Sequence, residues 1–79
     1  MTKVQTTYHK ARMIDGTASA HPTDRGPNCE SIELARMAPV PGPETAIIRS
    51  EWRLGGDGDW HITNTIVVEL CTAQGTVVR

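Results

Sequence analysis

Hydrophobic and polar residues alternate along two stretches, residues 44–54 and 60–72, which flank a short run of glycine and aspartate. Both stretches are rich in Ile, Val, Thr and Trp, which favour the pleated, half-buried surface of a β-strand. The run between them, GGDGD, is typical of the loop of a β-hairpin. We therefore expect the chain to be organised around one long hairpin.

Centring the hairpin on Asp57 predicts its register. One face is then apolar except for Ser50 and Asn64, which lie opposite each other and can share hydrogen bonds. The other face is polar except for Ile47 and Val67. A shift of one residue would bury the charges and expose both Trp residues, so the register is well specified. The predicted pairs are Leu54–Trp60, Trp52–Ile62, Ile48–Ile66 and Ala46–Val68 on the apolar face, and Arg53–His61, Glu51–Thr63, Arg49–Thr65 and Thr45–Glu69 on the polar face.

The rest of the chain predicts shorter elements around this hairpin. Residues 4–14 contain a Thr-Thr-Tyr run and alternate loosely, which indicates a strand. Residues 16–28 have no apolar periodicity and read as a long surface loop. Three prolines make residues 39–44 a rigid connector. Residues 76–79 are expected to form a short final strand that folds back on the end of the hairpin.

Residues 30–38, ESIELARMA, are ambiguous between helix and strand. Glu, Leu, Ala and Met are good helix formers, and Asn28 is a candidate N-cap with Glu30 or Glu33 in the first turn. A strand would instead point Ile32 and Leu34 inward. The neighbouring segments all read as β, and we therefore favour a strand here.

Composition limits the size of the core. The chain has 79 residues, enough for one domain spanning 1–79, and its Val, Ile and Leu number 15 with no Phe. Such a chain can bury only a thin core, and self-association would bury more apolar surface. We expect a mainly β fold, a small antiparallel sheet or open barrel of four to five strands. Residues 30–38 are the segment that could instead form a short helix, and the alternative fold class is α+β. We also expect a homodimer or a higher homo-oligomer.

Charge and targeting signals exclude several classes of function. The formal net charge is −1 and the eight Lys and Arg residues are scattered among nine acids, which argues against nucleic-acid binding. No stretch approaches the length of a membrane-spanning segment or the apolar core of a signal peptide, so we expect a soluble cytoplasmic protein without a membrane partner. Cys29 and Cys71 are interpreted as two unpaired thiols, with a bridge between them as the alternative.

No motif in the sequence predicts catalysis, a cofactor or a metal site. The run GGDGDW resembles one copy of a calcium-binding nonapeptide, but Trp60 stands where that motif needs Asp, and a solubilising turn is the simpler interpretation. The His and Cys residues lack the close spacing of zinc ligands. No nucleophile motif or phosphate-binding loop is present. We therefore expect no enzyme.

The polar face of the hairpin is the predicted binding surface. A mixed-charge, Thr-rich face beside an apolar pair is typical of protein-binding surfaces, with Arg49 and Arg53 as anchors. The sequence thus predicts a non-catalytic protein-binding or assembly module that self-associates; one version is a small phage- or mobile-element-encoded inhibitor of a host protein. The alternative is a small β-barrel that binds single-stranded nucleic acid. The predicted partner-binding residues are Arg49, Glu51, Arg53, His61, Thr63 and Thr65.

Overall fold

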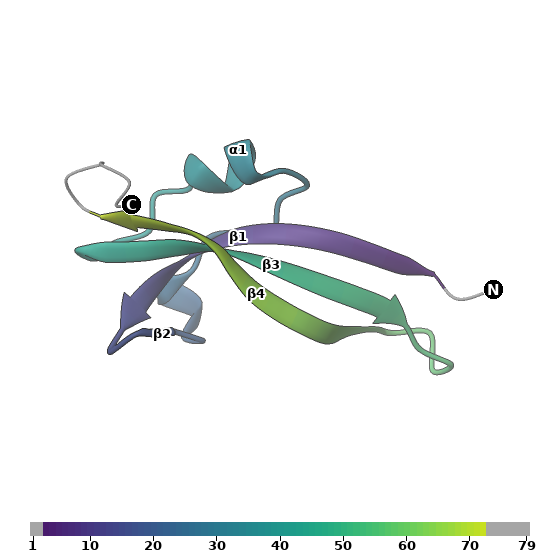
Figure 1. The fold of residues 1–79 in the computed structure, drawn as a ribbon. Coiled ribbons are helices and arrows are strands. Elements are labelled where there is room, and N and C mark those ends of the chain that lie inside the picture. The colour runs from purple at the N-terminus through teal and green to yellow at the C-terminus, as the bar shows by residue number, and fades with distance from the viewer. Residues whose placement is uncertain (1–2, 73–79) are drawn as a thin grey trace.

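A computed structural model describes residues 3–72 as a curled four-stranded antiparallel sheet with one short α-helix (Figure 1). The strand order is β2-β1-β3-β4, so β2 and β4 are the two edges. This confirms the expected mainly β fold. The elements in chain order are β1 (Val4–Ile14), β2 (Thr17–Ala18), the 3₁₀-helix η1 (Pro22–Asp24), α1 (Ile32–Arg36), β3 (Glu44–Leu54) and β4 (Trp60–Thr72).

The predicted strand at 4–14 is confirmed as β1, and a tight turn follows it. Asp15 and Gly16 adopt positive φ angles of 53° and 80°, a conformation that glycine adopts freely and aspartate tolerates. The turn sends the chain back antiparallel as β2. The predicted loop at 16–28 is therefore not wholly irregular, because it contains β2 and η1. The predicted final strand at 76–79 lies outside the described residues.

The strand favoured for residues 30–38 is wrong, because Ile32–Arg36 forms α1. The N-cap is Ser31, not Asn28: the Ser31 hydroxyl accepts a hydrogen bond of 3.2 Å from the backbone N–H of Leu34. A serine at this position satisfies one of the N–H groups that the first helical turn leaves free. The helix buries Ala35, a residue small enough to let it approach the sheet closely.

The two hairpin strands β3 and β4 have the predicted bounds, but their register is right only beside the turn. Leu54–Trp60, Arg53–His61 and Trp52–Ile62 pair as expected. Two β-bulges then insert Thr63 and Val68 as extra residues of β4. Beyond them the predicted pairs are wrong: Ser50 lies opposite Thr65, Ile48 opposite Val67 and Ala46 opposite Leu70, while Glu51 pairs with Asn64, Arg49 with Ile66, Ile47 with Glu69 and Thr45 with Cys71.

Small cores lie on both sides of the sheet. Paired residues share a face, so Lys10, Ile47 and Glu69 lie on one side, which we call the α1 side because the helix covers it. The opposite side, the β2 side, holds the cluster of Ala11, Ala46 and Ile48. Figure 1 shows α1 on one side of the sheet and β2 on the other.

The helix explains one of the two apolar residues that interrupted the predicted polar face of the hairpin. Ile47 is fully buried, on the side that α1 covers. The helix has only five residues, about 8 Å of length, whereas the molecule is 44 Å long. Much of the hairpin is therefore a single layer, which leaves apolar side chains of β4 exposed.

Candidate protein-binding surface

The structure divides the six predicted binding residues between two sides of the sheet. Arg49, Glu51 and Arg53 occupy alternate positions of β3 and lie on the α1 side. They are closer to the hairpin turn than Ile47, the residue that α1 covers. The Arg49 guanidinium donates to the Glu51 carboxylate across 2.8 Å, and both side chains are well exposed. His61 pairs with Arg53 on the same side. The structure thus keeps four of the six together.

The two threonines do not join this group as predicted. Thr63 is the extra residue of a bulge, and its hydroxyl donates to the backbone carbonyl of Glu51 at 3.2 Å. Thr65 lies opposite Ser50, which places it on the β2 side. The bulge at Thr63 causes this, because one extra residue turns every following side chain to the other face. A role in partner binding for the remaining four stays a prediction.

The GGDGD loop is closed by its own hydrogen bonds. The Asp57 carboxylate accepts from the backbone N–H of Asp59 at 3.0 Å and lies 3.0 Å from His61 Nε2. These two contacts, the backbone bond first, lower the pKa of Asp57. The carboxylate also comes so close to Gly55 that a Cβ there would meet it at 2.7 Å. Asp57 therefore stabilises the hairpin turn.

A surface that the sequence analysis assigned to the core is exposed instead. β4 carries large apolar side chains that are 37–53% exposed, although the predicted register placed most of them on the buried face. The limited second layer explains the difference on both sides of the strand: β2 has only two residues to cover the β2 side, and the five-residue α1 leaves Ile66, which pairs with Arg49 on the α1 side, exposed. These residues, which we call the β4 strip, are Trp60, Ile62, Ile66, Val67, Val68 and Leu70.

The strip lies on an edge strand. In the strand order, β4 has a neighbour only in β3, so its outer backbone edge is unpaired within residues 3–72. From Ile62 to Val68 the strand has no charged residue, whereas edges of monomeric sheets are commonly protected by charges or proline. The two bulges provide some protection, because they twist the edge locally. The uncharged run is visible in the sequence, but its place at the edge of the sheet is not, because that depends on the strand order.

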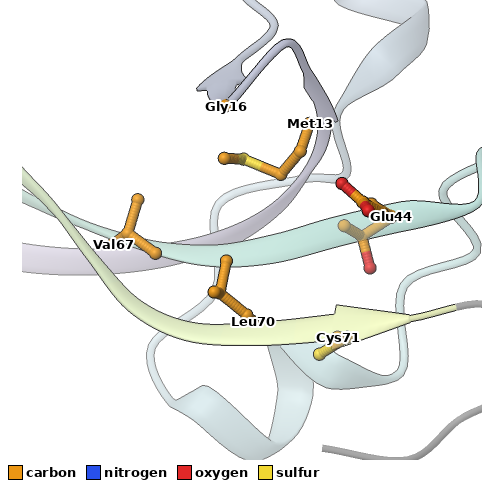
Figure 2. Close-up of a pocket in the computed structure, with 7 residues that line it drawn as sticks. Met13, Gly16, Glu44, Val67, Leu70 and Cys71 are labelled. Atoms are coloured by element: carbon orange, nitrogen blue, oxygen red, sulfur yellow. The ribbon is translucent and has the colours of Figure 1, made fainter. Parts of the chain in front are cut away.

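A hollow on the β2 side borders the strip. A cavity of about 480 Å³ lies between the β1–β2 turn and β4, and the side chains of Met13, Val67 and Leu70 surround its opening (Figure 2). A second cavity of about 340 Å³ adjoins it and shares Gly16 and Val67. Both fall in the lower part of the range for ligand pockets, about 300–1,000 Å³. Neither cavity could be predicted from the pattern of residues.

A salt bridge fixes α1 to the edge strand. Arg36 Nε and Nη2 donate to the two carboxylate oxygens of Glu69 at 2.8 and 2.6 Å, a bidentate arrangement. The hydrogen bond with Arg36 is the largest influence on Glu69 and lowers the pKa of its carboxyl. This contact crosses over β3, because Glu69 lies opposite Ile47. It therefore holds one side of β4 in place.

Neither cysteine is in a disulfide. Burial, followed by the charge of Glu69, raises the pKa of the Cys71 thiol. A raised pKa disfavours the thiolate at neutral pH, which is the reactive form. Cys71 is therefore poorly suited to act as a nucleophile.

Residues 3–72 contain no group of three His, Cys, Asp or Glu side chains arranged to hold a metal ion. Over the same residues no helix combines the length and apolar character required to cross a membrane.

The geometry therefore provides an open sheet edge, an exposed apolar strip and an adjoining hollow. Comparisons of the chain with protein family models, with curated proteins and with solved structures found no match.

Proposed function

We propose that this chain is a non-catalytic protein-binding and assembly module that self-associates, with β4 as its binding surface. The observation that carries the proposal is the β4 strip on an open sheet edge. Contiguous exposed apolar residues on a soluble domain mark interaction sites more often than isolated ones do. An open edge adds backbone donors and acceptors that a further strand can pair with.

The exposed apolar surface is large enough to matter energetically. Burying the exposed half of one large apolar side chain contributes roughly 1 kcal/mol. The six residues of the strip on each of two copies would together contribute on the order of 10 kcal/mol. Association requires about 4–15 kcal/mol for lost translational and rotational freedom. Backbone hydrogen bonds between the edges add to the gain, so the gain is comparable to this cost and we expect association that depends on protein concentration.

A role as inhibitor of another protein would use the same surface. An extended segment of a target could add to the β4 edge as a further strand.

The alternative, binding of single-stranded nucleic acid, lacks a supporting observation. Trp60 is exposed enough to stack on a base. However, within β1, β3 and β4 the Lys and Arg residues fall on the α1 side, whereas Trp60 lies on the β2 side. A nucleic-acid groove needs both features on one surface.

Sedimentation velocity over 1–200 µM tests the proposal. We expect the wild type to shift from monomer to dimer across this range, and Ile66→Lys to stay monomeric because it places a charge in the strip. The matched control is Met37→Lys, which makes the same kind of change at an apolar residue that is 77% exposed, just after α1. A wild-type monomer at 200 µM, or equal effects of both substitutions, would contradict the proposal.

A further inference from the structure

The two edge strands of the sheet border the same hollow. The second cavity is lined from one side by Thr17 and Ala18 of β2 and from the other by residues 65–67 of β4, with Ile48 also lining it. Curling of the sheet has brought its first and last strands to the two sides of one opening, yet they do not pair. We call this opening, with the adjoining first cavity, the mouth. A fully closed barrel would have no such gap.

The mouth is shaped for apolar side chains of an extended segment. Its walls are mainly apolar or small, and the two cavities have Gly16 and Val67 in common in their linings. One charged residue, Glu44, lines the pair of cavities, at the end where β3 begins. The edge of β4 that has no neighbouring strand among residues 3–72 borders the mouth, so a strand entering it could form backbone hydrogen bonds while its side chains fill the hollow.

We propose that β4 of a second copy enters the mouth, so that each copy's β4 pairs antiparallel with the other and contributes side chains to the other's hollow. This inference rests on the proposed self-association and specifies where it occurs. The result is a continuous sheet of eight strands across a two-fold axis. Side chains of the partner copy's β4 then fill the mouth of each copy, which stays open in the monomer.

Symmetry favours a second copy as the occupant. An antiparallel pair of identical strands is compatible with a two-fold axis, which makes the contact self-complementary and closed. Like charges are the usual obstacle to such a contact, and none lies between Ile62 and Val68. The same residue, Val67, both lines the hollow and belongs to the strip that would enter it.

The area of surface available for burial is also large enough for a dimer interface. A standard interface buries about 800 Å² on each partner. The chain exposes 5549 Å², so such an interface would use roughly one seventh of it. β4 supplies 13 of the 70 described residues, and ten of them, residues 60–68 and 70, are exposed. β4 and the rim of the mouth therefore offer enough surface for an interface of this size.

A substitution on the far wall of the mouth tests the inference. Thr17 is exposed and lines the hollow but lies on β2, away from the β4 edge. We expect Thr17→Trp to fill the space and to raise the dimer dissociation constant at least tenfold. Thr23→Trp, an equivalent change at an exposed threonine in η1 that lines neither cavity, should change it less than twofold. Circular dichroism would show that both variants fold.

The outcomes separate this inference from the proposed function. If Ile66→Lys abolishes dimers and Thr17→Trp has no effect, the copies associate through β4 without entering the mouth, and the inference is overturned while the proposed function stands. If the wild type is monomeric, the proposed function fails and the inference with it.

A cross-linking measurement gives an answer even if Thr17→Trp does not fold. A photoreactive benzophenone would be attached to Thr17→Cys in a chain whose Cys29 and Cys71 are replaced by Ser, and this chain would be mixed with ¹⁵N-labelled copies. Cross-links to β4 of the labelled copy support the inference. Cross-links confined to the same copy, including to its own residues 73–79, or directed to α1 of the other copy, overturn it.

Discussion

Trp52 and Trp60 lie on the same side of the sheet but in different surroundings. Trp52 is half-buried, and its indole Nε1 donates a hydrogen bond of 2.8 Å to the Thr7 hydroxyl on β1. Trp60 is 37% exposed at the end of the hairpin. Both had been expected in the core, and the reason they differ is that β1 packs beside β3, whereas nothing in residues 3–72 continues the sheet beyond β4.

Removing these side chains should therefore have unequal effects on the monomer. We expect Trp52→Ala to lower the free energy of unfolding by about 2 kcal/mol, less than for a fully buried aromatic residue. Trp60→Ala should lower it by less than about 1 kcal/mol, and Arg53→Ala is the exposed control. Urea unfolding at 1 µM protein measures all three. Equal losses for Trp52→Ala and Arg53→Ala would show that the register beside the turn is wrong.

His9 makes the stability of the fold depend on pH. Its imidazole is buried beside Ile48, and burial, followed by the nearby charge of Arg25, lowers its pKa from 6.5 to about 4. The folded chain thus keeps His9 neutral, whereas the unfolded chain binds a proton below pH 6.5. The stability is complete above pH 6.5 and should fall by at most about 3 kcal/mol as the pH drops to 4.

Unfolding by urea at pH 7 and pH 4.5 measures this effect. The stability of the variant His9→Gln should differ much less between the two pH values, whereas His21→Gln, at the exposed N-cap of η1, should keep the difference. A wild type equally stable at both values would contradict the assignment. The sequence did not single out His9 among the three histidines, because its burial results from the pairing of β1 with β3.

At the scale of elements, α1 depends on its N-cap. Ser31→Ala removes the acceptor of the Leu34 N–H and should destabilise the helix by about 1 kcal/mol. Asn28→Ala is the matched control, because Asn28 contacts Arg25 and not the helix. Hydrogen exchange of the residue 34–37 amides should accelerate in the first variant alone. Acceleration in both would mean that the loop before the helix, and not the cap, holds α1 in place.

Strand positions in the hairpin could be predicted from the sequence, but its bulges could not. The alternation of Ile, Val and Thr with polar residues gives the bounds of β3 and β4 correctly. The bulges arise because β4 has 13 residues where β3 has 11, and neither Thr63 nor Val68 is a residue type that marks a bulge. Local pattern cannot locate them, since they depend on the coiling of the whole sheet.

Helix α1 shows the opposite limitation. ESIELARMA carries good helix formers, and the neighbouring β segments wrongly favoured a strand. A stronger signal lay elsewhere, in Ile47, one of two apolar residues on the predicted polar face, because a buried residue there requires a covering element. The short helix covers Ile47, and matching this position with the ambiguous segment would have predicted the packing.

At the scale of the whole molecule, two surfaces are candidates for the binding site. The predicted residues Arg49 and Arg53 lie on the α1 side, and the β4 strip lies on the edge. If self-association uses β4, Arg49→Glu/Arg53→Glu should change the dimer dissociation constant less than threefold in sedimentation equilibrium. A tenfold loss in this double variant, with Ile66→Lys harmless, would return the binding site to the polar face.

The composition predicted why such a surface exists, although not where it lies. A chain with 15 Val, Ile and Leu among 79 residues cannot cover both faces of a long hairpin. The structure places the uncovered surface on β4, because the single helix packs over Ile47 on the other side. The location follows from the position of α1, which the sequence left ambiguous.

Hydrogen exchange of the wild type at 1 µM and at 200 µM tests the central claim most directly, because it reports both association and its location. The open edge of β4 should exchange rapidly in the dilute sample, and amides of residues 60–72 should become at least tenfold better protected in the concentrated one, with β1 and α1 unchanged. Identical exchange of β4 at the two concentrations, or new protection on α1 instead, would contradict self-association through this strand.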